Sequence, residues 1–247
     1  MAVAILFVSD THLSADRPER VEAFLDFLAT AAPKAEALYL LGDVFDLWLG
    51  DDDLAPPNGE IVAGLAAVTG GGLPVFALHG NHDFLLGPGF AQASGCRILS
   101  DPAVLDLYGE GVLASHGDYL CTDDTEYLAW RAYSRSPAVQ QAFLAQPLAA
   151  RRAQAAVIRD KSRARARMKP QEILDVNLGA VTGALREHRV LLLVHGHTHR
   201  PGAYPVEVDG ATGERVVLGD WYEGDSVLVW SPEGHRHCRV RELDAVL

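Results

Sequence analysis

Five short motifs carry the side chains that bind transition metals in proteins. In chain order they are Ser9–His12, Gly42–Asp46, Gly80–Asp83, His116–Asp118 and His195–His197. Mixed oxygen and nitrogen ligands of this kind suit Mn, Fe, Zn or Ni better than Ca, which prefers oxygen alone. A carboxylate such as Asp43 has two oxygens and can bridge two ions. Two ions held about 3.5–4 Å apart can stabilise both the attacking and the leaving oxygen of a phosphoryl displacement.

Each motif alone has a simpler interpretation. Asp10 and His12, two residues apart, are typical of a turn, and Gly-Asp after a strand is common. Asn81 tolerates the left-handed backbone of many turns, and His195 and His197 are compatible with a turn that binds nothing. The presence of all five motifs in one chain is what favours a two-metal centre.

The motifs follow apolar segments that indicate buried β-strands. These segments are 4–8, 37–41, 75–78, 112–114 and 190–194. Helical spacing of apolar residues predicts helices over Pro18–Ala31 and Glu60–Val68, and the tail from Tyr204 onward predicts strands with a turn at Asp209-Gly210. Ligands gather at the carboxyl ends of strands in layered α/β folds, so we expect the motifs to meet at one edge.

Length and composition indicate one globular α/β domain over residues 1–247. The chain has 49% hydrophobic and 22% charged residues, which is ordinary for such a domain. Its three scattered cysteines favour a reducing compartment. The apolar run Ala2–Val8 follows no basic residue, so it is interpreted as a buried strand and not a signal peptide. No segment has the ~20 apolar residues that a spanning helix needs.

Charge is distributed unevenly along the chain. The formal net charge of −12 argues against nucleic acid as a partner. Eight of the 21 Lys and Arg residues nevertheless lie between Arg151 and Lys169, where Asp160 is the one acid. This basic segment predicts a contact with phosphate or an anionic membrane surface. A solvated helix face is the alternative.

In their order, the five motifs resemble those of the calcineurin-like metallophosphoesterase superfamily. The resemblance implies a four-layer sandwich, two β-sheets flanked by helices, with a dinuclear centre at one edge. The implied ligands of the first ion are Asp10, His12, Asp43 and His197. Those of the second ion are Asp43, Asn81, His116 and His195. A bridging hydroxide, its pKa lowered by both cations, would be the nucleophile.

Longer stretches resemble the UDP-2,3-diacylglucosamine diphosphatases of lipid A biosynthesis in Gram-negative bacteria. They are Gly42–Asp52, Phe84–Gly87, His116–Asp124, Met168-Lys169 with Glu172–Asn177, and His195–Pro201. The resemblance covers nearly the whole chain. It implies attack of the metal-activated hydroxide on the α-phosphorus of UDP-2,3-diacylglucosamine, giving UMP and 2,3-diacylglucosamine 1-phosphate (lipid X).

The same resemblance implies the cofactors, partners and location. The cofactors would be two Mn²⁺ ions, with other divalent transition metals as alternatives. The substrate would be a lipid-linked nucleotide sugar, with no obligate protein partner. The protein would be cytoplasmic and bound peripherally to the inner membrane.

Residues 124–169 would form a helical lid insertion over the site. Its apolar side chains could receive acyl chains or simply pack a small helical subdomain; they are Tyr127, Leu128, Trp130, Tyr133, Val139, Phe143, Leu144 and Leu148. The implied substrate contacts are Asn81, His82, Asp124, Ser162, Ala166, Lys169 and His195. Catalytic roles fall to His82 and Asp43.

Two positions depart from the family pattern. His82 stands where the family usually has arginine, and Ala166 stands where a polar residue is frequent. An imidazole gives no bidentate clamp, so the candidates for a substitute cation are Arg163, Arg165 and Arg167.

Two other functions compete with the lipid enzyme. One is a metallophosphoesterase acting on another nucleotide diphosphate or phosphodiester, which would need no apolar lid. The other is a metal-free binding scaffold, which missing ligands would favour. The motifs contain the full set of implied ligands.

Overall fold

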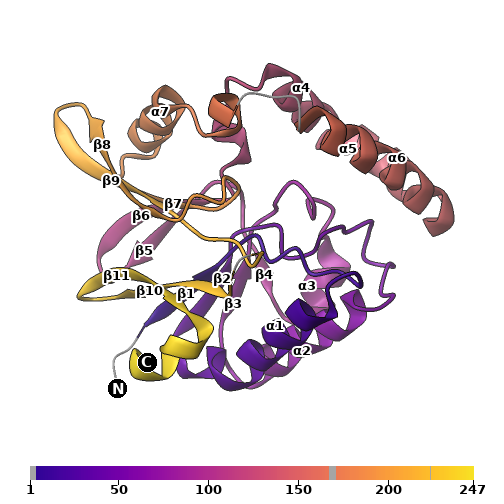
Figure 1. The fold of residues 1–247 in the computed structure, drawn as a ribbon, viewed down its shortest axis with the longest axis horizontal. Helices are drawn as coiled ribbons and strands as arrows, with labels where there is room; N and C mark the ends of the chain where they lie inside the picture. Colours follow the sequence, from indigo (N-terminus) through magenta and orange to yellow (C-terminus); the bar gives the residue numbers. More distant parts are fainter. Residues whose placement is uncertain (1–3, 167–170, 223) are drawn as a thin grey trace.

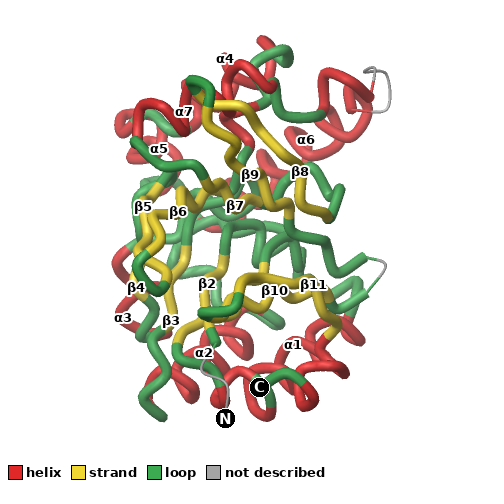
Figure 2. Tube along the Cα trace, turned by 90° about the vertical axis from the view of Figure 1, so that its left-hand side faces the viewer, coloured by secondary structure: helices red, strands yellow, loops and turns green. Residues whose placement is uncertain are grey.

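The computed structural model describes residues 4–166, 171–222 and 224–247. Two β-sheets stack face to face, and helices cover the outer face of each (Figures 1 and 2). This arrangement confirms the predicted four-layer α/β sandwich.

The first sheet has six strands in the order β11-β10-β1-β2-β3-β4. Their bounds are β1 (Ile5–Val8), β2 (Ala37–Leu40), β3 (Val75–Ala77), β4 (Arg97–Ile98), β10 (Ser226–Ser231) and β11 (Gly234–Arg239). Strands β1 to β4 run parallel, whereas β10 is antiparallel to β1 and to β11. The carboxyl ends of the four parallel strands therefore share one edge.

The second sheet has five strands in the order β5-β6-β7-β9-β8. Their bounds are β5 (Ala103–Leu107), β6 (Glu110–Ser115), β7 (Leu192–His195), β8 (Gly202–Val208) and β9 (Ala211–Val217). β6, β7 and β9 run parallel, and β5 and β8 are antiparallel edge strands. The predicted Asp209-Gly210 turn joins β8 to β9, with both residues at positive φ.

Helices cover the sandwich on both sides and extend from it in one place. α1 (Pro18–Thr30), α2 (Asn58–Gly70) and α3 (Pro88–Ser94) lie against the first sheet, and α7 (Leu178–His188) lies against the second. The segment 124–169 contributes α4 (Thr125–Ser134), α5 (Pro137–Leu144) and α6 (Leu148–Ala166), which project from the upper side in Figure 1. Short 3-10 helices occur at Ala32–Lys34, Asp118–Leu120, Gln171–Leu174 and Val240–Ala245.

Successive residues of a strand pack on opposite faces of its sheet. On β1, Leu6 packs toward the helices of the first sheet, and Phe7 packs between the two sheets against Trp230. On β7, Leu193 packs against α7. β1 is buried on both faces, as a continuous apolar run predicts for a central strand. No helix in the described part of the chain is long and apolar enough to span a membrane.

The strand predicted over 190–194 is displaced toward the carboxyl end. α7 ends at Arg189 in the left-handed conformation (φ 57°), and the amide of Val190 donates to the carbonyl of Leu185. This helix-ending turn uses the residues that the sequence assigned to the strand, so β7 begins at Leu192. The short elements α3, β4 and β5 were not predicted.

The loops after β2 and β3 touch backbone to backbone. Gly42 has φ +86°, and a Cβ on it would lie 2.6 Å from the Cα of Gly80. A Cβ on Gly80 would lie 2.1 Å from Oδ1 of Asp43. Only glycine fits at both positions, and this close approach brings two of the polar motifs together.

We expect Gly42→Ala to destabilise the protein more than Gly72→Ala does. Both glycines have positive φ, but a Cβ on Gly72 would meet open space. The control should therefore lose about 1–2 kcal/mol of unfolding free energy from left-handed strain alone. Gly42→Ala should lose a further ~1–3 kcal/mol from overpacking. Equal losses in urea denaturation of the two variants would contradict the close approach.

Candidate metal centre

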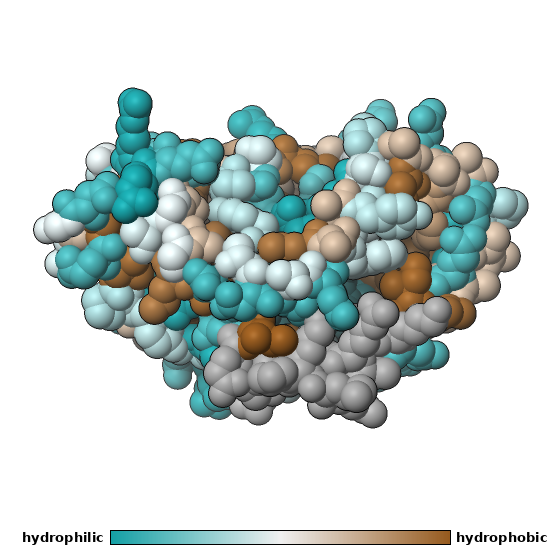
Figure 3. All heavy atoms as spheres, turned by 90° about the horizontal axis from the view of Figure 1, so that it is seen from above, coloured by the Kyte–Doolittle hydropathy of each residue, from teal (hydrophilic) through white to brown (hydrophobic). Residues whose placement is uncertain are grey.

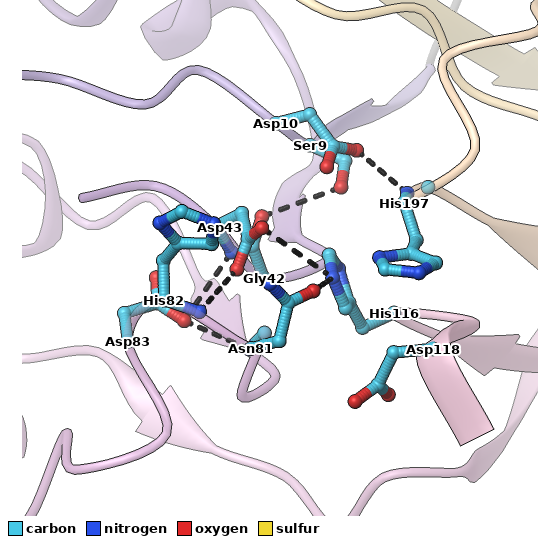
Figure 4. A network of polar contacts seen from close by, with 12 residues as sticks. Ser9, Asp10, Gly42, Asp43, Asn81, His82, Asp83, His116, Asp118 and His197 are labelled. Carbon is cyan, nitrogen blue, oxygen red and sulfur yellow. Dashed lines mark hydrogen bonds and ion pairs between the residues drawn. The ribbon is translucent and has the colours of Figure 1, made fainter. Parts of the chain in front are cut away.

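The five polar motifs converge where the parallel strands of both sheets end (Figure 4). β1 delivers Asp10 and His12, β2 delivers Asp43, and β3 delivers Asn81 and His82. From the second sheet, the end of β6 delivers one imidazole and the end of β7 delivers two; these are His116, His195 and His197. The edge predicted from the sequence is thus shared between the sheets.

Three groups of side chains place their ligand atoms within 4.8 Å of one another. They are Asp10, His12 and His199; His12, Asp46 and His82; and Asp10, Asp43 and His116. Because the groups share members, they form one continuous cluster. Carboxylate and imidazole donors in such a cluster suit a divalent transition metal.

The backbone of the cluster is held in an uncommon conformation. Five non-glycine residues have φ between 44° and 67°: Asp10, His12, Asp43, His197 and His199. Left-handed backbone is unfavourable for such residues and concentrates at functional sites. Four of the seven implied metal ligands share this feature, so the fold strains their backbone to aim the side chains.

Asp83 holds the loops in place. Its side chain is fully buried. Oδ1 accepts hydrogen bonds from the amides of Gly80 (2.8 Å) and Asp43 (3.2 Å), and Oδ2 accepts one from Val44 (2.8 Å). Asp83 belongs to the third polar motif but had no predicted role, and the structure identifies it as the carboxylate that joins the β2 and β3 loops.

Asp43 lies at the middle of the cluster. Its Oδ1 accepts a hydrogen bond from the amide of His82 (2.8 Å). Its Oδ2 lies 3.7 Å from Nε2 of His12 and 3.6 Å from Nε2 of His116. Burial raises the pKa of this carboxyl to about 6, against the opposing charges of His116 and His82. A central carboxylate with imidazoles on two sides fits the bridging role expected for Asp43.

His116 carries a proton that a metal must displace. Nδ1 donates to the carbonyl of Leu41 (2.9 Å), and Nε2 donates to Oδ1 of Asn81 (2.9 Å). Both partners are acceptors, so both ring nitrogens are protonated. Burial lowers the pKa of His116, but Asp43, Asp10 and other carboxylates outweigh it and raise the pKa to about 9.

Asp10 is bound by a histidine that the sequence did not single out. Its Oδ2 accepts the amide of His197 (2.9 Å), and its Oδ1 lies 3.2 Å from Nε2 of His199. The other nitrogen of His199 lies 3.0 Å from Asp220. Burial lowers the pKa of His199, but its hydrogen bonds to the two carboxylates raise it to about 10. The spacing His-x-His-x-His was the available signal.

One buried ring nitrogen is suited to receive an ion. Nδ1 of His195 donates to the carbonyl of Gly196 (2.8 Å), which leaves Nε2 with its lone pair. This Nε2 has no hydrogen-bond partner among the described residues. Burial lowers the pKa of His195 to about 4, so the ring is neutral at pH 7. Buried polar atoms normally have partners, and this one fits a metal ligand.

The ring of His197 lies apart from the three groups. Its centroid is 5.1 Å from that of His116 and 6.1 Å from that of Tyr127. On the other side of the cluster, the ring of Tyr222 lies 5.3 Å from His12, with the guanidinium of Arg20 above it at 4.2 Å. Neither Tyr222 nor Arg20 was predicted to belong to the site.

The implied substrate contacts are only partly brought together. Asn81 and His82 lie in the cluster, and Nδ1 of His82 donates to the carbonyl of Asp46 (2.8 Å). Asp124 caps α4 by accepting the amide of Tyr127 (3.0 Å). Ser162, Ala166, Arg163 and Arg165 lie in the last turns of α6. Lys169 and Arg167 lie outside the described residues.

The described cations of the basic segment pair with an acidic loop. Arg151 binds both carboxylate oxygens of Asp52 and the carbonyl of Leu49. The other pairs are Arg152 with Asp53 and Arg159 with Asp46. The sequence predicted contacts with phosphate or a membrane for this segment, whereas these three arginines attach α6 to loop 46–53.

A family model described as calcineurin-like phosphoesterase matches residues 3–201. The chain belongs to this family. Three curated relatives carry the name UDP-2,3-diacylglucosamine hydrolase. The protein of Aeromonas hydrophila is 46% identical, with 95% of this chain and 97% of the relative covered. That of Pseudomonas paraeruginosa is 46% identical, with 96% and 98% covered. That of Salmonella agona is 47% identical, with 94% and 96% covered. These matches confirm the resemblance seen in the longer motifs.

We expect Mn²⁺ affinity to rise with pH. The proton on Nε2 of His116 competes with the metal up to a pKa of about 9. The affinity of the second ion should therefore increase about tenfold per pH unit from pH 6.5 to 8.5. Below pH 6, protonation of Asp43 should make the Mn²⁺ affinity decrease more steeply as the pH is lowered. Mn²⁺ titrations at several pH values test this, with His188→Gln as a remote control. A flat profile in the wild type would contradict the assignment.

Substitution of Asp43 and His82 should separate metal binding from substrate contact. Asp43→Ala should lose both ions, because its carboxylate lies between the imidazoles of His12 and His116. Its turnover should fall by more than the roughly 10²–10⁴-fold of an ordinary general base. His82→Ala should retain its metal content while turnover falls. Loss of one ion in His82→Ala, measured by metal analysis, would make the ligand assignment wrong.

Proposed function

We propose that this chain hydrolyses the pyrophosphate bond of UDP-2,3-diacylglucosamine, giving UMP and 2,3-diacylglucosamine 1-phosphate. The main support is the continuous cluster around Asp10, Asp43 and His116. It lies in a chain 46% identical, over 95% of its length, to a hydrolase of that name. The match includes the insertion that a small soluble phosphodiester would not require.

Two Mn²⁺ ions, when bound, would supply a nucleophilic hydroxide at neutral pH and stabilise the charge that develops on the phosphate. The proposed ligands of the first ion are Asp10, His12, Asp43 and His197. Those proposed for the second are Asp43, Asn81, His116 and His195. The grouping of His199 with Asp10 and His12 supports a role for His199 in orienting Asp10.

His82 and Arg159 together could replace the arginine that the family usually has. Nδ1 of His82 donates to the carbonyl of Asp46, so Nε2 would donate to a phosphate oxygen only from the imidazolium form. Arg159 pairs with the carboxylate of the same Asp46. Its buried Nε has no hydrogen-bond partner among the described residues. Arg159 and His82 thus meet at Asp46, and the guanidinium would supply the cation that the family pattern has at position 82.

The insertion supplies apolar surface for acyl chains. Trp130 is 40% exposed, Tyr133 57% and Leu144 40%. Viewed from the side of α4 to α7, hydrophobic side chains form patches between hydrophilic ones (Figure 3). Phe143, by contrast, packs against the core of the first sheet. Packing and lipid contact are thus divided among different residues of the insertion.

A lipid-linked substrate also suggests where the protein works. Acyl chains hold UDP-2,3-diacylglucosamine in a membrane, and the exposed apolar residues of the insertion suit contact with its surface. We infer peripheral binding at the cytoplasmic face of the inner membrane, with no nucleic acid and no obligate protein partner.

Hydrolysis of UDP-2,3-diacylglucosamine with Mn²⁺, followed by UMP release, tests the proposal. Shortening both acyl chains should lower kcat/KM by orders of magnitude, because remote binding energy positions the phosphate. Trp130→Ser with Tyr133→Ser should lower kcat/KM on the acylated substrate about tenfold or more and spare a small chromogenic phosphodiester. Val104→Ser, an equally exposed apolar site on β5, is the matched control. Equal efficiency on chain-free UDP-sugars would leave only the general phosphoesterase function.

A further inference from the structure

Two side chains of α4 and that of its C-cap residue, Arg135, converge on one carboxylate of the metal-centre loops. Tyr127, Arg131 and Arg135 are spaced four residues apart, so they lie on one face of the helix. All three donate to Oδ2 of Asp118: the hydroxyl of Tyr127, Nε of Arg131 (2.8 Å) and Nη2 of Arg135 (3.0 Å). Asp118 is fully buried and follows His116 by two residues (Figure 4).

The convergence binds α4 firmly to the core of the protein. A buried carboxylate without partners is costly, and removal of one partner of a buried ion pair is strongly destabilising. Asp118 receives two guanidinium groups and a hydroxyl from α4 alone. The insertion is therefore attached to the β6 loop by ion pairs that salt screens much less than surface pairs.

The two arginines differ in what else they hold. Nη2 of Arg135 also donates to the carbonyl of Gly80 (2.9 Å), the residue before Asn81. Nη2 of Arg131 instead lies 3.4 Å from Asp101. Arg135 thus spans the β6 loop, through Asp118, and the β3 loop, through Gly80.

These two loops carry the residues that meet in the cluster. His116 donates to Oδ1 of Asn81 (2.9 Å), and both are proposed ligands of the second ion. The two ligands are therefore linked twice. One link is the direct hydrogen bond between His116 and Asn81. The other is Arg135, which binds Asp118, two residues after His116, and Gly80, the residue before Asn81. Arg135 therefore bridges the two loops on which these two ligands lie.

We propose that Arg135 is a positioning residue that couples the insertion to the half of the metal centre formed by Asn81 and His116. Docking of α4 sets the separation of these two side chains. By reciprocity, an ion bound between them stabilises the docked α4. The proposal rests on the proposed metal centre but not on the identity of the substrate.

Through this coupling, metal binding would also affect the part of the insertion that is implied to contact the substrate. Asp124, an implied substrate contact, caps α4, and the helix carries the exposed Trp130 and Tyr133. A helix stabilised by the second ion presents these groups in a fixed position. The apolar surface for the lipid is then complete only when the metal centre is loaded.

Mn²⁺ titration by calorimetry tests the first half of the coupling. Arg135→Gln should bind one of two ions at least tenfold more weakly and leave the other, at Asp10 and His12, unchanged. Arg135→Lys should show the same loss, since one ammonium pairs with Asp118 without spanning to Gly80. Arg152→Gln, an exposed arginine of α6, is the matched control and should bind both ions as the wild type does.

Hydrogen exchange of the α4 amides tests the reciprocal half. Saturating Mn²⁺ should slow exchange in α4 at least tenfold in the wild type and in Arg152→Gln, but not in either Arg135 variant. Exchange in β1 serves as the measure of an intact fold. If the β1 amides of Arg135→Gln exchange rapidly, this variant is not folded, and the result is then taken from Arg135→Lys.

The outcomes separate the coupling from the metal centre itself. Wild-type affinity for both ions in Arg135→Lys, with Mn²⁺ still protecting α4, would overturn the coupling and leave the metal centre standing. Absence of Mn²⁺ binding in the wild type would remove the metal centre, and the coupling with it.

Discussion

The burial of several carboxylates beside several imidazoles in one place is the constraint on which the rest of the structure depends. Each charge loses hydration there and needs a partner of opposite charge or a hydrogen bond. Asp10, Asp43 and His116 obtain these partners from one another and from backbone amides. His195 lacks such a partner, because its Nε2 has no hydrogen bond within the described residues. An ion of charge +2 would satisfy what the chain cannot.

The backbone yields to this constraint. Asp10, His12 and Asp43 adopt left-handed conformations, which a peptide of the same sequence would rarely populate. Such strain persists only where the surrounding structure determines each position several times over. β1 is buried on both faces, and Asp83 accepts three amides from the adjoining loops at 3.2 Å or less. The buried strand β1 and the side chain of Asp83 therefore hold these residues in their unfavourable backbone conformation.

The sequence predicted the parts of the site that are local. An apolar run followed by Asp or His determines both the strand and the polar residue at its end, so the placements of Asp10, Asp43 and His116 were predicted correctly. Contacts between distant segments leave no such pattern. His199 meets Asp10 across 189 residues, and Arg135 meets Gly80 across 55. The boundary of β7 was wrong for a related reason, because the end of α7 uses Val190 in its closing turn.

The insertion is not held equally at its two ends. α4 is attached through Asp118, which is fully buried, so salt does little to its ion pairs. Two of the three ion pairs that attach α6 have one exposed partner, since the side chain of Asp52 is 61% exposed and that of Arg152 49%. In the third pair, Arg159 and Asp46 are 26% and 10% exposed. Exposed pairs contribute at most about 1 kcal/mol each and weaken in salt. The ion pairs of α4 with Asp118 should therefore be less sensitive to salt than the pairs that Arg151 and Arg152 make from α6.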